Sequence, residues 1–157
     1  MKKIHALTTP VALGIVILDQ IIKNILISKD IFWFEPENWF SVAPSYNVGI
    51  AFSLPFPRIP LIVASAAIIA LALVWWKRNT LKNTRQAVGM GLFVGGALSN
   101  MIDRIWHGLV IDYINIWTGA LNIADLAIIT GIILLIFSTT KKLEKEDIHL
   151  PRYPGRP

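Results

Sequence analysis

Long runs of apolar residues, separated by short polar segments, dominate the pattern along the chain. Four runs approach the length of a membrane-spanning helix, because about 20 residues cross the ~30 Å hydrocarbon core of a bilayer. They cover residues 8–28, 60–76, 87–106 and 121–138. The second run contains no charged residue, whereas each of the others carries polar side chains. The pattern therefore predicts an all-α membrane protein with four transmembrane helices.

The segment between the first two runs, residues 29–57, has a different pattern. It alternates aromatic with polar residues around Trp33 and Trp39, and prolines interrupt it. Alternation with a period of two is typical of short strands, and aromatic rings favour the membrane interface. We therefore expect a small β-like subdomain at the membrane surface.

Basic residues flank the apolar runs and predict their orientation, because Lys and Arg gather in the cytoplasmic segments next to membrane spans. They cluster at the N-terminus, at residues 77–85 and after residue 141, whereas segments 29–57 and 107–120 together hold only Lys29. We therefore expect both termini in the cytoplasm and both of these segments outside. The protein would lie in the cytoplasmic (inner) membrane as a multi-pass protein.

Composition agrees with a membrane protein, since the chain is 54% hydrophobic and has a mean hydropathy of +0.56. The net charge of +5 sits beside the apolar runs and not on a basic patch interleaved with aromatics, so we expect no nucleic-acid partner. The absence of cysteine excludes a disulfide framework, a thiol nucleophile and thiolate metal sites. Residues 1–140 form one predicted membrane domain, and residues 141–157 a charged, Pro-rich cytoplasmic tail.

Charged and amide side chains near the apolar runs point to a functional site, because a charge at the bilayer centre costs roughly 2.5–3.5 kcal/mol on insertion scales. They occur in the outer halves of the first and third runs, at the start of the fourth, and in the short loop before it. These residues are Asp19, Lys23, Asn100, Asp103, Arg104, Asp112, Asn122 and Asp125, with the polar Gln20, Asn24 and Ser99 beside them. Because the predicted topology brings all of them to one depth, we expect a shared site at the outer face.

Some of these charges also have a structural explanation. Asp19 and Lys23 are four residues apart and can pair on one helix face. Asp103 and Arg104 can form a second pair that fixes the third helix. Opposite charges that neutralise one another need no catalytic role.

Capping and packing provide further structural explanations. Asn122 can cap the fourth helix, where the positive end of the helix dipole favours Asp125. Gly91 and Gly95 form a G-x-x-x-G pair that allows close approach of another helix. Gly49 is expected to supply a turn where the outer segment meets the site.

Five short motifs, in this order, resemble those of the prolipoprotein signal peptidases, or signal peptidase II. They are DQIIKN at 19–24, NVGIAF at 47–52, GGALSNMIDR at 95–104, VIDY at 110–113 and NIAD at 122–125. Each motif alone is weak, but five in order on a matching topology are specific. The resemblance implies an aspartyl endopeptidase that removes the signal peptide from diacylglyceryl-modified prolipoproteins by cleaving just before the lipidated Cys.

The resemblance also implies roles for individual residues, with Asp112 and Asp125 as the catalytic dyad. The residues that would line the site are Asn47, Asn100, Arg104 and Asn122. Those that would support it are Asp19 and Lys23, to which we add Gly49 and Asp103. The sequence departs from the family pattern at Ser99, where Gly is usual, and at Tyr113, where Phe is commoner. The interval between the two catalytic positions is also short, which suggests a trimmed loop.

Two close carboxylates suit peptide hydrolysis without a metal or cofactor. They cannot both ionise cheaply, so one keeps a proton and acts as acid while the other activates water. The three histidines are too scattered for a zinc site. One chain would suffice, so we expect a monomer in contact with membrane lipid and prolipoprotein substrates.

Two other functions remain open from the sequence. A small proton-coupled carrier could use the carboxylates as a relay, although the chain lacks paired broken helices and concentrates its polar residues at one face. A non-catalytic membrane assembly factor is the third possibility.

Overall fold

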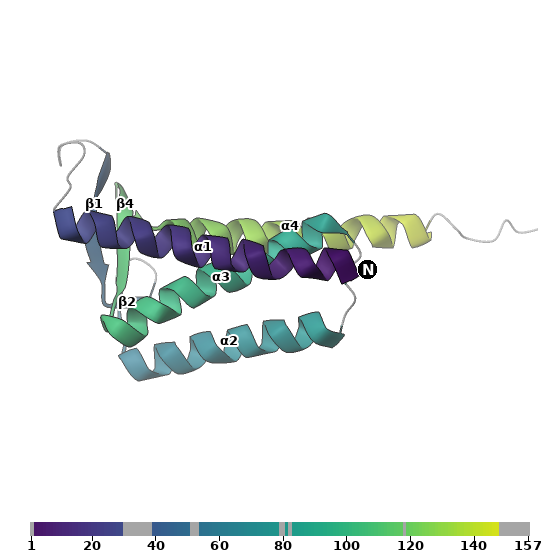
Figure 1. Ribbon diagram of the computed structural model, residues 1–157, viewed down its shortest axis with the longest axis horizontal. Coiled ribbons are helices and arrows are strands. Elements are labelled where there is room, and N and C mark those ends of the chain that lie inside the picture. The colour runs from purple at the N-terminus through teal and green to yellow at the C-terminus, as the bar shows by residue number, and fades with distance from the viewer. Residues whose placement is uncertain are drawn as a thin grey trace, which may run out of the picture.

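The computed structural model describes residues 2–29, 39–50, 54–78, 81, 83–117 and 119–147. These residues are mostly helical, with small antiparallel sheets near one end of the helices (Figure 1). The helices are α1 (Lys2–Lys29), α2 (Arg58–Arg78), α3 (Thr84–Trp106) and α4 (Ile123–Asp147). The strands are β1 (Phe40–Asn47), β2 (Gly49–Ile50), β3 (Leu54–Pro55), β4 (Val110–Ile116) and β5 (Gly119–Leu121). The predicted mainly helical fold with a small β subdomain is confirmed.

Three segments differ from the sequence predictions. The first helix is predicted to begin near residue 8, but α1 begins at Lys2. The apolar pattern predicts that the fourth helix ends near residue 138, but α4 continues to Asp147, because its Lys- and Glu-rich end has good helix propensity. Asp112 is predicted in a loop, but it lies in β4, whose β-branched residues favour a strand. Residues 148–157 of the predicted tail, and Trp33 in the aromatic segment, lie outside the described residues.

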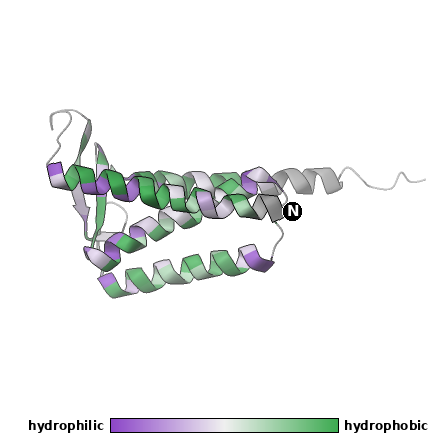
Figure 2. Ribbon diagram, viewed as in Figure 1, coloured by the Kyte–Doolittle hydropathy of each residue, from purple (hydrophilic) through white to green (hydrophobic). Residues whose placement is uncertain are grey.

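Apolar residues dominate the surfaces of the helices (Figure 2). Among the described residues, Ala6–Lys29 and Arg58–Arg78 are long and apolar enough to cross a membrane, and Ile123–Ser138 is a shorter apolar helix. Leu71 and Phe137 are each 68% exposed, which suits an apolar solvent and not water. The fold is that of a membrane protein, and the count of four spans stays a prediction.

Glycines let α3 pack against α1 and α4 with its backbone almost in contact. A Cβ atom at Gly95 would lie 2.6 Å from the carbonyl oxygen of Ala12 on α1. Gly96 faces the other way, and a Cβ there would overlap the carbonyl oxygen of Ala124 on α4. Gly91 also faces α1. The predicted G-x-x-x-G packing is confirmed, and α3 is the central helix.

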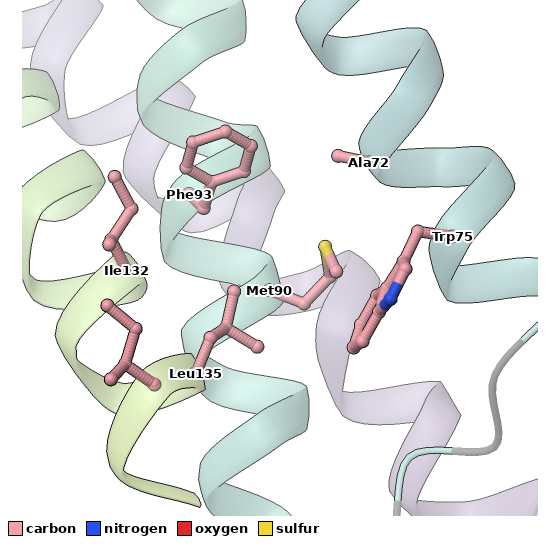
Figure 3. Close-up of a pocket in the computed structure, with 7 residues that line it drawn as sticks. Ala72, Trp75, Met90, Phe93, Ile132 and Leu135 are labelled. Carbon is pink, nitrogen blue, oxygen red and sulfur yellow. The ribbon is translucent and has the colours of Figure 1, made fainter. Parts of the chain in front are cut away.

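Helix α2 stands apart from the other helices and packs mainly against α3 (Figure 1). Near its C-terminal end, α2 borders an apolar cavity of about 240 Å³ shared with α3 and α4 (Figure 3). The lining includes Ala72, Trp75, Met90, Phe93, Ile132 and Leu135. Helix α2 buries little of its own surface inside the protein.

Strand β4 is the middle strand of the larger sheet, with β1 on one side and β5 on the other. The pairing of β1 with β4 is antiparallel and shifts register between Val42 and Ser45. Such a bulge redirects the side chains that follow it. After the shift, Ser45 pairs with Asp112 and Asn47 with Val110. The sheet thereby brings the end of β1 next to the first residues of β4.

Arg58, at the start of α2, caps the C-terminal end of α3. Its Nε donates to the carbonyl oxygen of Arg104 at 2.7 Å, and its Nη2 donates to that of Ile105 at 2.5 Å. The last carbonyls of a helix lack partners within the helix, and the negative end of the helix dipole attracts a cation. Arg58 therefore has a structural role: it holds the start of α2 against the end of α3.

We expect Gly95→Ala to lower the free energy of unfolding by about 1–3 kcal/mol, because the added methyl group must push α1 away from α3. Thermal unfolding in detergent micelles measures the change. Gly14→Ala is the matched control, because nothing lies within 4 Å of the added atom, and its effect should be neutral or slightly stabilising. Equal losses in both variants would contradict close packing as the constraint.

Candidate active site

Lys23 is the centre of a buried charge cluster between α1 and α3. Its side chain is 1% exposed, and Nζ lies 2.5 Å from Asp19 Oδ2 and 2.7 Å from Asp103 Oδ2. The ammonium group also donates a long hydrogen bond to Asn100 Oδ1 at 3.5 Å. The predicted Asp19–Lys23 pair is confirmed, and Asp103 joins it.

Asp103 pairs with Lys23 and not with its neighbour Arg104, which corrects the predicted structural pair. Successive residues on a helix point about 100° apart, so the two side chains leave α3 in different directions. Asp103 also accepts hydrogen bonds from Gln20 Nε2 at 2.7 Å and from the backbone nitrogen of Ile111 at 3.1 Å. The bond to Ile111 ties the start of β4 to α3.

Asp19 is completely buried, and both of its oxygens are occupied. Its Oδ2 accepts from Ser99 Oγ at 2.7 Å, besides the ion pair with Lys23. Its Oδ1 accepts from the Tyr113 hydroxyl at 3.0 Å and from the backbone nitrogen of Ala124 at 3.3 Å. A carboxylate with so many donors is a support for the surrounding helices, which fits its predicted supporting role.

The sequence groups Gln20 and Ser99 with the polar side chains expected at one depth, but it assigns no individual role to either of them or to Tyr113. Ser99 and Tyr113 are otherwise noted only as departures from the family pattern, although both hydroxyls contact Asp19. The available signal for Gln20 was a polar side chain next to a charge in an apolar run.

The carboxylates of Asp112 and Asp125 meet at one residue, Asn122. The side-chain nitrogen of Asn122 donates to Asp112 Oδ1 at 2.6 Å, and its backbone nitrogen donates to Asp125 Oδ2 at 3.2 Å. The backbone nitrogen of Asp125 donates in return to Asn122 Oδ1 at 2.8 Å. This reciprocal pair is a capping box, so the predicted helix cap is confirmed and also fixes Asp125.

Two further asparagines complete the contacts of these carboxylates. Asn47, at the end of β1, donates to Asp112 Oδ2 at 3.2 Å, and Asn100 on α3 donates to Asp125 Oδ1 at 2.7 Å. The backbone nitrogen of Gly49 donates to Asn47 Oδ1 at 3.0 Å, which closes the predicted turn and orients the amide. Each carboxylate oxygen therefore has an amide donor, which leaves it capacity for water or a proton.

The pKa of Asp112 is raised to about 6, mainly because the carboxyl group is buried and also because the negative charge of Asp125 lies nearby. Hydrogen bonds from Asn47 and Asn122 and the charge of Lys23 act in the opposite direction. A carboxyl group with this pKa can hold or release a proton near neutral pH. The arrangement is therefore suited to general acid–base chemistry.

Arg104 lies beside the carboxylates without pairing closely with one of them. Its Nη1 makes a long hydrogen bond to the carbonyl oxygen of Asn100 at 3.4 Å, and its positive charge acts on Asp125, Asp103 and Asp112. The structure thus brings together all ten predicted site residues. Within the described residues, no group of three His, Cys, Asp or Glu side chains is placed to hold a metal ion.

Comparisons with known proteins give one consistent result. The family described as Signal peptidase (SPase) II matches residues 11–141. A lipoprotein signal peptidase of Teredinibacter turnerae is 33% identical and covers 82% of this chain and 84% of its own length. The lipoprotein signal peptidase of Aquifex aeolicus is 34% identical and covers 87% of each chain.

Two solved structures have a similar fold, and both are described as bacterial membrane enzymes. One superposes with a TM-score of 0.76 at 23% identity and covers 92% of each chain. The other has a TM-score of 0.71 at 25% identity and covers 82% of this chain and 89% of its own. The arrangement of helices and sheet is therefore that of a known membrane enzyme fold.

We expect Lys23→Met to lower the free energy of unfolding by about 3–5 kcal/mol, because it leaves Asp19 and Asp103 buried without their cation. Chemical or thermal unfolding in detergent measures the loss. The matched control is Lys29→Met at the exposed end of α1, where the change should stay within about 0.5 kcal/mol. A Lys23→Met variant as stable as this control would show that the cluster contributes no stability.

Proposed function

The chain belongs to the signal peptidase II family, and on this basis we propose that it removes the signal peptide from diacylglyceryl-modified prolipoproteins, cleaving just before the lipidated Cys. It is an aspartic-type peptidase, as its family indicates. The observation that carries the proposal is the pair of carboxylates, Asp112 and Asp125, held by the single residue Asn122.

In the proposed mechanism, Asp112 and Asp125 share one proton. The ionised carboxylate takes a proton from water as the water oxygen attacks the scissile carbonyl carbon, and the protonated carboxylate gives its proton to the carbonyl oxygen. The tetrahedral intermediate then collapses and the C–N bond breaks. The carboxyl group that took the proton from water gives it to the leaving nitrogen, and the other carboxylate recovers its proton from a hydroxyl of the intermediate as the carbonyl re-forms. The two groups titrate as a pair, so we assign the shared proton to neither residue.

The neighbouring side chains support this chemistry in two ways. Asn47, Asn100 and Asn122 hold the carboxylates through neutral amides, which orient the reacting oxygens without supplying a full positive charge to either. The positive charge of Arg104 offsets part of the negative charge of the dyad. The site can therefore keep one proton and still favour an ionised partner.

We further propose that α1 to α4 cross the inner membrane with both termini in the cytoplasm, as the positions of the basic residues indicate. The dyad would then lie at the outer face, where a diacylglyceryl group has its acyl chains in the outer leaflet. The sheet subdomain, with Trp39 76% exposed beside β1, would cover the substrate from above. One chain supplies both carboxylates, so a monomer is sufficient.

We expect Asp112→Asn and Asp125→Asn each to reduce cleavage of a diacylglyceryl-modified prolipoprotein peptide about 10²-fold or more, because each removes a general acid or base. The rate is measured with purified protein, with and without a chelator. Asp147→Asn, at the opposite end of α4, is the matched control and should cleave normally. Substantial activity in either dyad variant would refute the mechanism, and loss of wild-type activity with chelator would indicate a metal.

The pH profile of kcat/KM should fall on its basic side, as the dyad loses its shared proton near the pKa of about 6 given above for Asp112. Asn47→Ala removes a hydrogen bond that favours the ionised form. The pKa should therefore rise, and the basic limb should move to higher pH. Asn115→Ala is the control, since Asn115 bonds to the Ala43 carbonyl in the same sheet. A limb that stays fixed, or moves to lower pH, would contradict this assignment.

A further inference from the structure

Tyr113 follows Asp112 directly on β4, and successive side chains of a strand point to opposite faces. Asp112 faces Asn47 and Asn122, whereas the Tyr113 ring is directed toward α1 and the start of α4. The ring is 3% exposed. One strand therefore presents a reacting carboxylate on one face and a buried hydroxyl on the other.

The Tyr113 hydroxyl makes two hydrogen bonds, one in each role available to it. It donates to Asp19 Oδ1 at 3.0 Å and accepts from the backbone nitrogen of Ile123 at 3.0 Å. The pKa of Tyr113 is raised, mainly because the phenol is buried and also because of the negative charge of Asp19. The phenol therefore stays protonated and remains a donor to Asp19 at every pH at which the enzyme would work.

The first backbone N–H groups of α4 have no partners within the helix and need acceptors from elsewhere. Ile123 donates to the Tyr113 hydroxyl, Ala124 to Asp19 Oδ1, and Asp125 to Asn122 Oδ1. The last of these bonds is local and would move with the helix. The other two come from β4 and α1, so they fix where α4 begins relative to the rest of the molecule.

We propose that Tyr113 is a positioning residue for Asp125: its hydroxyl ties the buried carboxylate of Asp19 to the N-terminus of α4. Asp125 lies in the first turn of this helix, so a shift of the helix start moves its carboxylate relative to Asp112. This role rests on the proposed function, in which these two carboxylates must act together. Small displacements of a reacting group can cost up to about 10²-fold in rate.

Ser99 provides the matched comparison. Its hydroxyl also donates to Asp19, at Oδ2 and 2.7 Å, but it comes from α3 and none of its hydrogen bonds reaches α4. Ser99 and Tyr113 are the two residue types that depart from the family pattern, and both departures add a hydroxyl donor to the same carboxylate. Removal of the Ser99 hydroxyl tests the support of Asp19 alone. Removal of the Tyr113 hydroxyl tests the support of Asp19 together with the positioning of α4.

The experiment compares Tyr113→Phe with Ser99→Ala in cleavage of a diacylglyceryl-modified peptide, in thermal stability and in amide hydrogen exchange. For Tyr113→Phe we expect kcat to fall about 10-fold, with KM within about twofold because the phenol is buried away from the reacting face. Exchange at Ile123 and Ala124 should become about 10-fold faster. Ser99→Ala and Tyr113→Phe should lower the thermal stability by similar amounts. Ser99→Ala should nevertheless leave kcat and the exchange at Ile123 and Ala124 within about twofold of wild type.

Asp125→Asn in the same assay separates failure of this inference from failure of the proposed function. If the wild-type protein does not cleave the peptide, the proposed function fails. If the wild type cleaves and Asp125→Asn cleaves at the same rate, the dyad mechanism fails, and the positioning of a reacting group by Tyr113 fails with it. If Asp125→Asn is inactive but Tyr113→Phe keeps wild-type kcat and exchange, or if Ser99→Ala loses as much kcat, the positioning role is overturned and the proposed function stands.

Discussion

The ion pairs of Lys23 are the constraint on which the rest of the structure depends. A buried ammonium group is costly in an apolar environment unless carboxylates and hydrogen bonds surround it. Asp19 on α1 and Asp103 on α3 provide the carboxylates. Each also accepts a hydrogen bond from another element, Asp19 from the start of α4 and Asp103 from the start of β4. The two elements that carry Asp112 and Asp125 are therefore fixed to the same charge.

Four aspartates lie in this part of the molecule, of which Asp19, Asp103 and Asp112 are buried and Asp125 is half-buried, and their partners divide them into two kinds. Asp19 and Asp103 form ion pairs with the Lys23 ammonium group. Asp112 and Asp125 have amide donors instead, and they lie close enough that the charge of one acts on the other. Neutral donors and mutual repulsion leave this second kind able to hold a proton. The same residue type thus serves as scaffold or as acid–base group according to its partners.

Much of the fold and site could be predicted because the signals are local. Hydropathy predicts the helices, a spacing of four predicts the Asp19–Lys23 pair, and Asn122 before an apolar run predicts a cap. What sequence reasoning missed depends on contacts between distant segments. β4 pairs with β1, and Asp103 on α3 forms an ion pair with Lys23 on α1. No local sequence pattern predicts either contact. The hydrogen bonds of the Tyr113 hydroxyl likewise depend on the packing of α1 and α4 against β4.

The separation of Lys23 and Asp103 along the chain has a consequence for biogenesis. Ribosomes add about 5–20 residues per second, so the nascent first helix waits roughly 4–16 s for the carboxylate of the third. During that interval its own Asp19 is the one partner already synthesised on the same helix face. Under the proposed membrane topology, the internal pair would form a self-contained neutral unit, so this segment could enter the bilayer before the helix that completes the cluster has been made.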